Sequence, residues 1–161
     1  MSDLLKLACD IAESGIDRVF GILGSGPSYT LLDALEKHNV EITTTPFEGS
    51  AAVMAGAYGR MSGKAGVAFS IKGPGLANML PGLAACKLEA LPIVSMAECY
   101  VPGTPASKAH KNMDHESMLK ALSKGRHFLT NSQHQFADLR ALAESEVPGP
   151  VHLELVADNS N

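Results

Sequence analysis

The sequence predicts an α/β fold, a single three-layer domain in which about six mostly parallel strands carry helices on both faces. Short apolar runs rich in β-branched residues alternate along the chain with longer segments whose apolar residues recur at helical spacing. Parallel neighbours need crossover connections, which helices supply. The 161 residues, 45% of them hydrophobic, suffice for one substantial core, and we see no internal repeat.

The first half of the chain is expected to form three helices and two strands. In the first helix, Leu4, Leu7 and Ile11 recur at helical spacing, and Gly15 is placed to end it. β-branched residues over 41–45 favour a strand. The expected elements are a helix from residue 3 to Gly15, a strand over 18–23, a helix over 29–38, a strand over 41–45 and a helix that starts near Glu48.

The second half continues the alternation, beginning with apolar runs of strand length over 66–71 and 91–96. Pro81 is expected to kink the intervening helix or to delay its start, because proline lacks the N–H of an interior helical residue. After Glu98 the periodicity gives way to turn residues, which predicts one long loop. The expected elements are a strand over 66–71, a helix over 76–90, a strand over 91–96, a helix over 116–124, a strand over 127–129, a helix over 133–146 and a strand over 150–156.

Composition argues against several classes of protein. A net charge of −4 without a basic cluster argues against nucleic acid or an anionic membrane as the partner, and favours a small molecule or a protein. Three widely spaced cysteines without a C-x-x-C pair do not favour a disulfide framework or a zinc site. The first residues contain no apolar stretch of signal-peptide or membrane-span length, so we expect a cytoplasmic protein. The domain is expected to cover 1–157, with a flexible tail over 158–161.

A carboxylate and a run of small residues follow the second predicted strand. Glu48 precedes the glycines and alanines of 49–57, so a flat group could lie against the start of this helix. A glycine-rich turn over 72–78 follows the next strand. Turns at the carboxyl ends of neighbouring parallel strands form ligand sites in α/β folds. Two alternatives stay open: Glu48 as a solvated first-turn glutamate, and the small residues as close packing of helix on sheet.

The turn over 21–28 follows the first strand, as nucleotide-binding turns do. Its glycines lack the G-x-G-x-x-G spacing, and no Gly-Lys-Ser/Thr completes a P-loop. A tight turn alone explains Gly21 and Gly24, whereas Ser25 places a hydroxyl at the strand end, toward the expected crevice. A flavodoxin-like nucleotide-binding protein is therefore the weaker alternative.

Four segments, over 19–24, 48–64, 73–78 and 92–94, follow one another in a specific order. Together they resemble the pyrimidine-binding N-terminal domain of thiamine-diphosphate enzymes, and the acetohydroxyacid synthase and 2-oxo-acid decarboxylase group most of all. The resemblance extends through 148–154 and so covers nearly the whole chain.

The resemblance implies a chemical task for Glu48. In this family a carboxyl group held against N1′ of the cofactor's pyrimidine shares the proton that forms the 4′-imino tautomer, and this tautomer deprotonates the thiazolium. Glu48 is implied to be this catalytic group. The implied cofactor-binding residues are Gly24, Ser25, Glu48, Gly73, Pro74, Gly75 and Asn78.

Three further residues are implied to act on the substrate. Lys72 replaces the small hydroxyl residue of relatives, and a cation there could pair with an anionic substrate group; an exposed loop lysine is the alternative. His110 and His115 fall where pyruvate-decarboxylase-like relatives have paired histidines, so either could relay a proton; surface histidines are the alternative. The implied reaction removes carbon dioxide from a small 2-oxo acid and ends in an aldehyde or a ligated hydroxyketone.

Relatives hold the cofactor's diphosphate and Mg²⁺ through a Gly-Asp-Gly segment on a separate domain, and these 161 residues contain none. The resemblance therefore implies the α subunit of a split 2-oxo-acid decarboxylase, of the sulfopyruvate or phosphonopyruvate decarboxylase type. It would act only in a hetero-oligomer with a diphosphate-binding β subunit that holds Mg²⁺, and no metal ligand is expected in this chain. The alternatives are a subunit of an acetohydroxyacid-synthase-like carboligase and a non-catalytic orphan binding domain.

Overall fold

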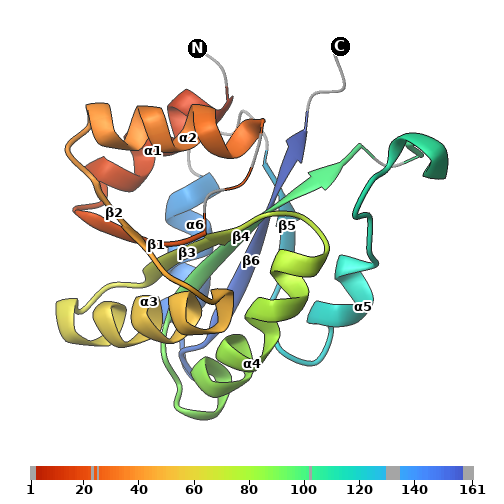
Figure 1. Cartoon of the computed structure of the whole chain (residues 1–161). Helices are drawn as coiled ribbons and strands as arrows, with labels where there is room; N and C mark the ends of the chain where they lie inside the picture. The colour runs from red at the N-terminus through yellow and green to blue at the C-terminus, as the bar shows by residue number, and fades with distance from the viewer. Residues whose placement is uncertain (1–2, 23, 25, 102, 130–134, 158–161) are drawn as a thin grey trace.

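The computed structural model describes residues 3–22, 24, 26–101, 103–129 and 135–157. They form one six-stranded sheet in the order β2-β1-β3-β4-β6-β5, with every neighbouring pair parallel. Figure 1 shows the sheet crossing the molecule between layers of helices. The predicted α/β fold is therefore confirmed, whereas the expected tail over 158–161 lies outside the described residues.

The element bounds follow the predicted order. The strands are β1 (Arg18–Gly21), β2 (Glu41–Thr44), β3 (Gly66–Ser70), β4 (Ile93–Tyr100), β5 (Arg126–Phe128) and β6 (Pro150–Ala157). The helices are α1 (Asp3–Glu13), α2 (Pro27–Lys37), α3 (Glu48–Ser62), α4 (Pro74–Leu88), α5 (His115–Leu119) and α6 (Gln135–Glu144), with a 3-10 turn, η1, over Ala106–Lys108. None of these helices is long and apolar enough to cross a bilayer.

Most bounds differ from the prediction by a few residues, and three of these differences have an evident physical reason. β4 extends to Tyr100 because its whole length pairs with β6, which the local sequence does not reveal. α4 begins at Pro74 and continues through Pro81, so the second proline does not delay its start. α5 is shorter than expected, because the N–H groups of residues 122 and 123 both turn back onto the carbonyl of Leu119.

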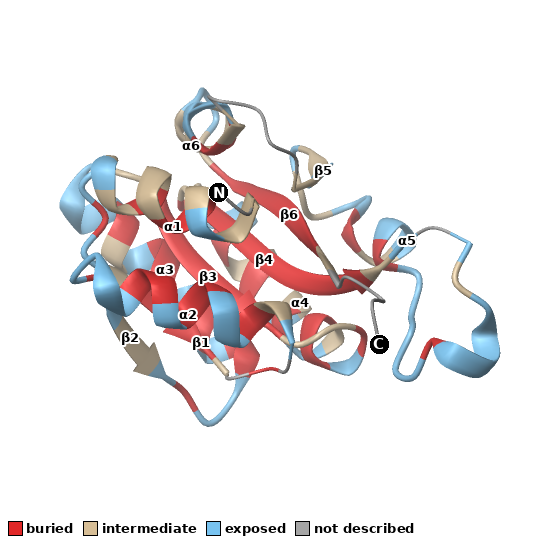
Figure 2. Ribbon diagram, turned by 90° about the horizontal axis from the view of Figure 1, so that it is seen from above, coloured by how far each residue is buried: buried red, intermediate tan, exposed pale blue. Residues whose placement is uncertain are grey.

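The sheet buries an apolar core on each face. On one face α1, α2 and α6 supply side chains such as Ile11, Leu31 and Phe136. On the other face α3, α4 and α5 enclose a second core that includes Met79 and Leu83. Strands β3 and β4 are covered on both sides, as the burial colours of Figure 2 show. This double burial explains why these strands read as continuous apolar runs.

Helices α3 and α4 approach each other closely at small residues. A Cβ on Gly82 of α4 would lie 2.2 Å from the carbonyl oxygen of Gly49 in α3. A Cβ on Gly56 would lie 2.8 Å from the sulfur of Cys86. The small residues of α3 therefore do serve close packing, and this packing brings the starts of both helices together beside Glu48.

The strand order reverses direction at the carboxyl ends of β1 and β3. The chain leaves β1 through α2 toward β2, whereas it leaves β3 through α4 toward β4 on the opposite side. Connections that diverge in this way leave a space between them, which is where open α/β sheets bind ligands.

Candidate functional site

Glu48 is the first residue of α3 and is only 7% exposed. The extended backbone of Phe47 precedes it, and the Phe47 carbonyl accepts the N–H groups of residues 50 and 51, which starts the helix. Asn78 of α4 donates from Nδ2 to Oε2 of Glu48 at 3.2 Å. Within the part of the chain that the structure describes, Oε1 accepts no hydrogen bond. Glu48 is therefore a buried carboxylate facing α4, not a solvated first-turn residue.

The turn between β3 and α4 forms the other side of this site. Gly73 has φ +60°, and a Cβ there would lie 1.8 Å from the carbonyl oxygen of Lys111. A Cβ on Gly75 would lie 3.4 Å from Oε1 of Glu48. Pro74 opens α4, where its fixed φ suits the first helical position. The absence of a side chain at 73 lets this backbone lie close to the loop before α5. A Cβ at 75 would lie 2.6 Å from the Ile71 side chain, so glycine there avoids a clash within the turn beside Glu48.

A second carboxylate, Glu98 of β4, lies against the segments that follow β1 and β3. It is fully buried, with Nζ of Lys72 at 2.9 Å from Oε2. Ser28 Oγ donates to Oε1 at 2.5 Å. A Cβ on Gly24 would lie 2.8 Å from the same oxygen, so a larger residue there would displace the Ser28 and Glu98 side chains. Glu98 was missed from the sequence, although an acid within an apolar run is the signal that marks it.

His115 opens α5 and is buried. The N–H of Gly73 donates to its Nε2 at 3.0 Å, so this nitrogen bears no hydrogen. The other nitrogen, Nδ1, lies 3.1 and 3.0 Å from the two carboxylate oxygens of Glu154 and donates to them. Arg126 Nε also donates to Glu154, at 2.6 Å. His115 therefore links the turn at Gly73 to a buried ion pair between β5 and β6.

Glu154 is ionised at the centre of this network. Burial raises the pKa of its carboxyl, but the hydrogen bonds that it accepts, above all those from His115, outweigh burial and hold the pKa below the ordinary 4.5. Burial lowers the pKa of His152, whose Nδ1 lies 2.9 Å from Ser95 Oγ. Sequence reasoning did not group Glu154 or Arg126 with the site, because only the folded sheet brings β5 and β6 beside α5.

The same groups include possible metal ligands. His115, His152 and Glu154 place possible ligand atoms within 4.8 Å of one another. A metal ion on Nδ1 of neutral His115 would require the ring hydrogen on Nε2, toward which the N–H of Gly73 already points. The donor set fits a hydrogen-bond network and does not fit a metal ion.

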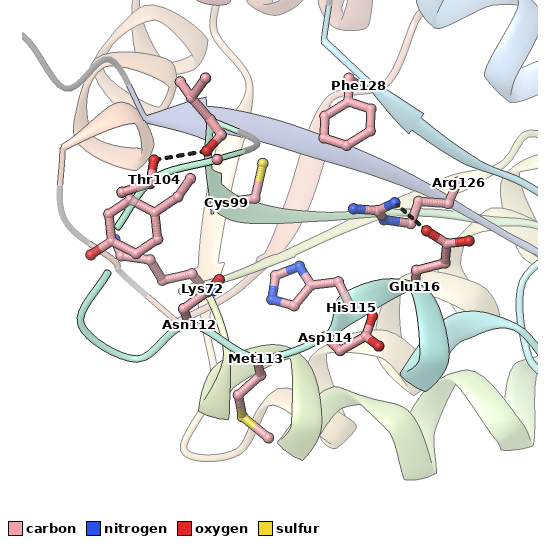
Figure 3. A pocket seen from close by; sticks show the side chains of 13 residues that line it. Lys72, Cys99, Thr104, Asn112, Met113, Asp114, His115, Glu116, Arg126 and Phe128 are labelled. Atoms are coloured by element: carbon pink, nitrogen blue, oxygen red, sulfur yellow. Dashed lines mark hydrogen bonds and ion pairs between the residues drawn. The ribbon is translucent and has the colours of Figure 1, made fainter. Parts of the chain in front are cut away.

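A pocket of about 370 Å³ opens beside this network. Figure 3 shows the His115 ring, the Cys99 thiol and the Arg126 guanidinium around it, with Lys72 at one side. Lys72 and Arg126 are each paired with a fully buried carboxylate. Burial raises the pKa of Cys99 to about 12, so this thiol stays protonated and is a poor nucleophile. The pocket therefore offers fixed polar groups without a reactive thiol.

The predicted site residues separate into distinct places. Those at the starts of α3 and α4 are Glu48, Gly73, Pro74, Gly75 and Asn78. Gly24 and Lys72 meet at Glu98, and Lys72 and His115 both line the pocket. His110 is an exposed residue that does not line the pocket. Ser25 lies outside the described residues.

We expect ionised Glu154 to account for part of the decrease in the free energy of unfolding at low pH. Because the pKa of its carboxyl is lower in the folded state than the ordinary 4.5, its stabilisation is complete above that value and is lost as the pH falls through the folded pKa. Urea denaturation between about pH 3 and pH 6 measures the free energy of unfolding, and the Glu154→Gln variant should lack this component. Exposed Glu36→Gln is the matched control. Parallel pH curves for wild type and Glu154→Gln would contradict the assignment.

Comparison with known proteins decides the family. The family model of the thiamine pyrophosphate enzyme N-terminal TPP binding domain matches residues 7–122, well over half of the chain. The chain belongs to this family. Thiamine pyrophosphate is thiamine diphosphate, so the resemblance to the pyrimidine-binding domain of these enzymes is confirmed.

Curated relatives of this TPP binding domain include synthases and a decarboxylase. The chain is 32% identical over 114 residues to an acetolactate synthase of Bacillus subtilis, which covers 71% of this chain and 20% of the relative. It is 31% identical over 148 residues to the acetolactate synthase isozyme 2 large subunit of Escherichia coli, covering 89% of this chain and 27% of the relative. It is 30% identical over 155 residues to a probable 2-ketoarginine decarboxylase of Pseudomonas aeruginosa, covering 92% of this chain and 27% of the relative. The chain thus spans only 20% to 27% of the length of these relatives.

Proposed function

We propose that this TPP binding domain is the pyrimidine-binding subunit of a two-chain, thiamine-diphosphate-dependent 2-oxo-acid decarboxylase. The observation that supports this function best is the buried carboxylate of Glu48. One of its oxygens is held by Asn78, and the other lies beside the bare backbone of Gly75.

The residues around Glu48 fit the aminopyrimidine of the cofactor. Glu48 Oε1 accepts no hydrogen bond from any described residue, so it is open to a donor such as protonated N1′. Gly75 presents no side chain beside this oxygen, and an added Cβ would lie in van der Waals contact with it at 3.4 Å. Asn78 holds Oε2 at 3.2 Å and thereby restricts rotation of the carboxylate. The glycine at 75 and the amide at 78 thus leave one oriented acceptor for the ring.

In this proposal, the chain contributes the carboxyl group of Glu48, which holds a proton at Oε1. Thiamine diphosphate, when bound, supplies a nucleophilic carbon that its own aminopyrimidine activates. Glu48 shares a proton between Oε1 and N1′ of the pyrimidine, acting as general acid and base. Asn78 donates to Oε2 and so directs the shared proton to Oε1.

We assign the diphosphate and Mg²⁺ to a diphosphate-binding β subunit. The chain covers 20% of its acetolactate synthase relative, so the architecture of that relative needs further protein. The outer face of α3 and α4 supports such a partner. Its large apolar residues Phe47, Val53 and Met54 are about two-fifths exposed and line an apolar hollow of about 390 Å³. A hetero-oligomer that covers this face would enclose the cofactor between two chains.

Carboligation is the second candidate reaction. Two of the relatives named above are acetolactate synthases, and one is a probable decarboxylase. We assign the substrate to the pocket beside Lys72 and His115, because two of the three predicted substrate residues line it and it adjoins the turn at Gly73. Exposed His110 lies on the loop beside this pocket and is a candidate for a proton relay.

Titration of thiamine diphosphate and Mg²⁺ into the full chain, with and without a diphosphate-binding chain encoded beside it, tests the proposal. We expect saturable binding and release of carbon dioxide from pyruvate or a related 2-oxo acid only when both chains are present. Proton NMR of the products separates an aldehyde from a hydroxyketone and so separates decarboxylase from carboligase. Binding without turnover in any pairing would favour an orphan binding domain. Binding of flavin or nicotinamide nucleotide to the isolated chain would contradict the proposal.

A further inference from the structure

The hydrogen bond between Gly73 and His115 connects the turn beside Glu48 with the network beneath the pocket. We propose that His115 is a positioning residue, whose unprotonated Nε2 holds the N–H of Gly73 and thereby fixes the first turn of α4 against Glu48. This inference rests on the proposed function in one respect, that Glu48 is the group being positioned.

The His115 ring is held in one orientation by both of its nitrogens. Nδ1 donates to the two oxygens of Glu154 at 3.1 and 3.0 Å, and Nε2 accepts from Gly73 at 3.0 Å. Glu154 is itself immobilised by Arg126, whose Nε donates to it at 2.6 Å. Because both ring nitrogens are engaged, a proton relay at His115 would require one of these bonds to break. The arrangement suits a fixed acceptor for the N–H of Gly73.

Gly73 is the point at which His115 acts on α4. The Gly73 carbonyl accepts the N–H of Ala77 at 2.9 Å, the first turn of the helix. Its N–H points the other way, to His115. With φ +60° and the Lys111 carbonyl only 1.8 Å from any added Cβ, the residue must be glycine. Both polar groups of this backbone unit are therefore used, one for α4 and one for His115.

A shift of the backbone at Gly73 would also move the first two turns of α4. Asn78, in the second turn of α4, donates to Oε2 of Glu48, and Gly75 borders Oε1. Without the acceptor on His115, the buried N–H of Gly73 would lose its partner, which a protein relieves by shifting the backbone toward water or another acceptor. A shift at Gly73 would move both contacts of the Glu48 carboxylate.

Two substitutions of His115 distinguish the roles of its two ring nitrogens. His115→Gln places an amide oxygen near the position of Nε2 and keeps an acceptor for Gly73. His115→Asn places its amide near the position of Nδ1 and removes that acceptor. Both are neutral and similar in polarity, so each is the matched control of the other.

Solution NMR of the labelled full chain reads out the proposed effect without any ligand. In the wild type we expect the His115 ring to carry its hydrogen on Nδ1. In His115→Asn we expect the Gly73 amide to exchange with solvent about tenfold faster, as loss of one hydrogen bond predicts. We also expect the carboxyl carbon of Glu48 and the side-chain amide of Asn78 to shift, and His115→Gln to restore all three signals.

Three results would overturn the inference. They are a wild-type ring with its hydrogen on Nε2, a Gly73 amide that exchanges equally fast in both variants, and Glu48 and Asn78 signals that stay in place while the Gly73 amide becomes exposed. The first needs no variant, so the inference stays testable even if His115→Asn fails to fold. None of these measurements involves the cofactor, so they fail or succeed independently of the proposed function.

Discussion

Glu48→Gln is expected to lower turnover of the proposed two-chain enzyme by about 100- to 10,000-fold, the range that general acid–base groups supply. Glutamine preserves the shape of the side chain but has a single acceptor oxygen. In the wild type, Asn78 Nδ2 donates a hydrogen bond to Oε2 of Glu48. In the variant it would donate to the single amide oxygen of the glutamine, which would then be occupied. The remaining amide would then present N–H groups to the pyrimidine and could not share a proton with N1′. Initial rates of carbon dioxide release from a 2-oxo acid measure the loss.

The control for this variant is Glu36→Gln, which makes the same chemical change on the exposed side of α2. It should leave turnover unchanged. Circular dichroism and the urea midpoint of Glu48→Gln should stay near those of the wild type, because the new amide fills the same volume. Undiminished turnover in Glu48→Gln would exclude Glu48 as the proton-sharing group.

Lys72→Met is expected to lower the free energy of unfolding by about 3–5 kcal/mol, the cost of removing one partner from a buried ion pair. Glu98 is fully buried in β4, and the Lys72 side chain is 12% exposed, so water cannot replace the lost cation easily. Methionine retains the length and apolar stem of lysine, so the loss reports on charge. Urea denaturation of the full chain measures it.

Lys37→Met is the matched comparison. Lys37 pairs with Asp33 one turn away on α2, with side chains 70% and 63% exposed. Such exposed pairs contribute about 0.3–0.5 kcal/mol, so this variant should remain near the wild type. The double variant Lys72→Met with Glu98→Gln should recover part of the loss, because no uncompensated charge is then buried. Equal losses in Lys72→Met and Lys37→Met would contradict a buried pair.

The part of the site around Glu48 could be predicted from sequence, because each of its residues lies in a short segment directly after a predicted strand. Glu48 and the glycines at 73 and 75 each lie in a turn directly after a strand, and parallel strands bring such turns to one edge. Glu98 could not be found in this way. Its β4 strand was expected to end at 96, and its partners Ser28 and Lys72 lie 70 and 26 residues away.

The sequence by itself determined the alternation of strands and helices, the glycine turns and the place of Glu48 at the start of α3. These features depend on side-chain periodicity and on backbone preferences, which act over a few residues. Only the tertiary structure decided how the buried charges are paired. Glu98 with Lys72, and Glu154 with Arg126 and His115, are joined across strands that meet in the folded sheet. Burial makes such pairing obligatory, but the choice of partner depends on which strands become neighbours.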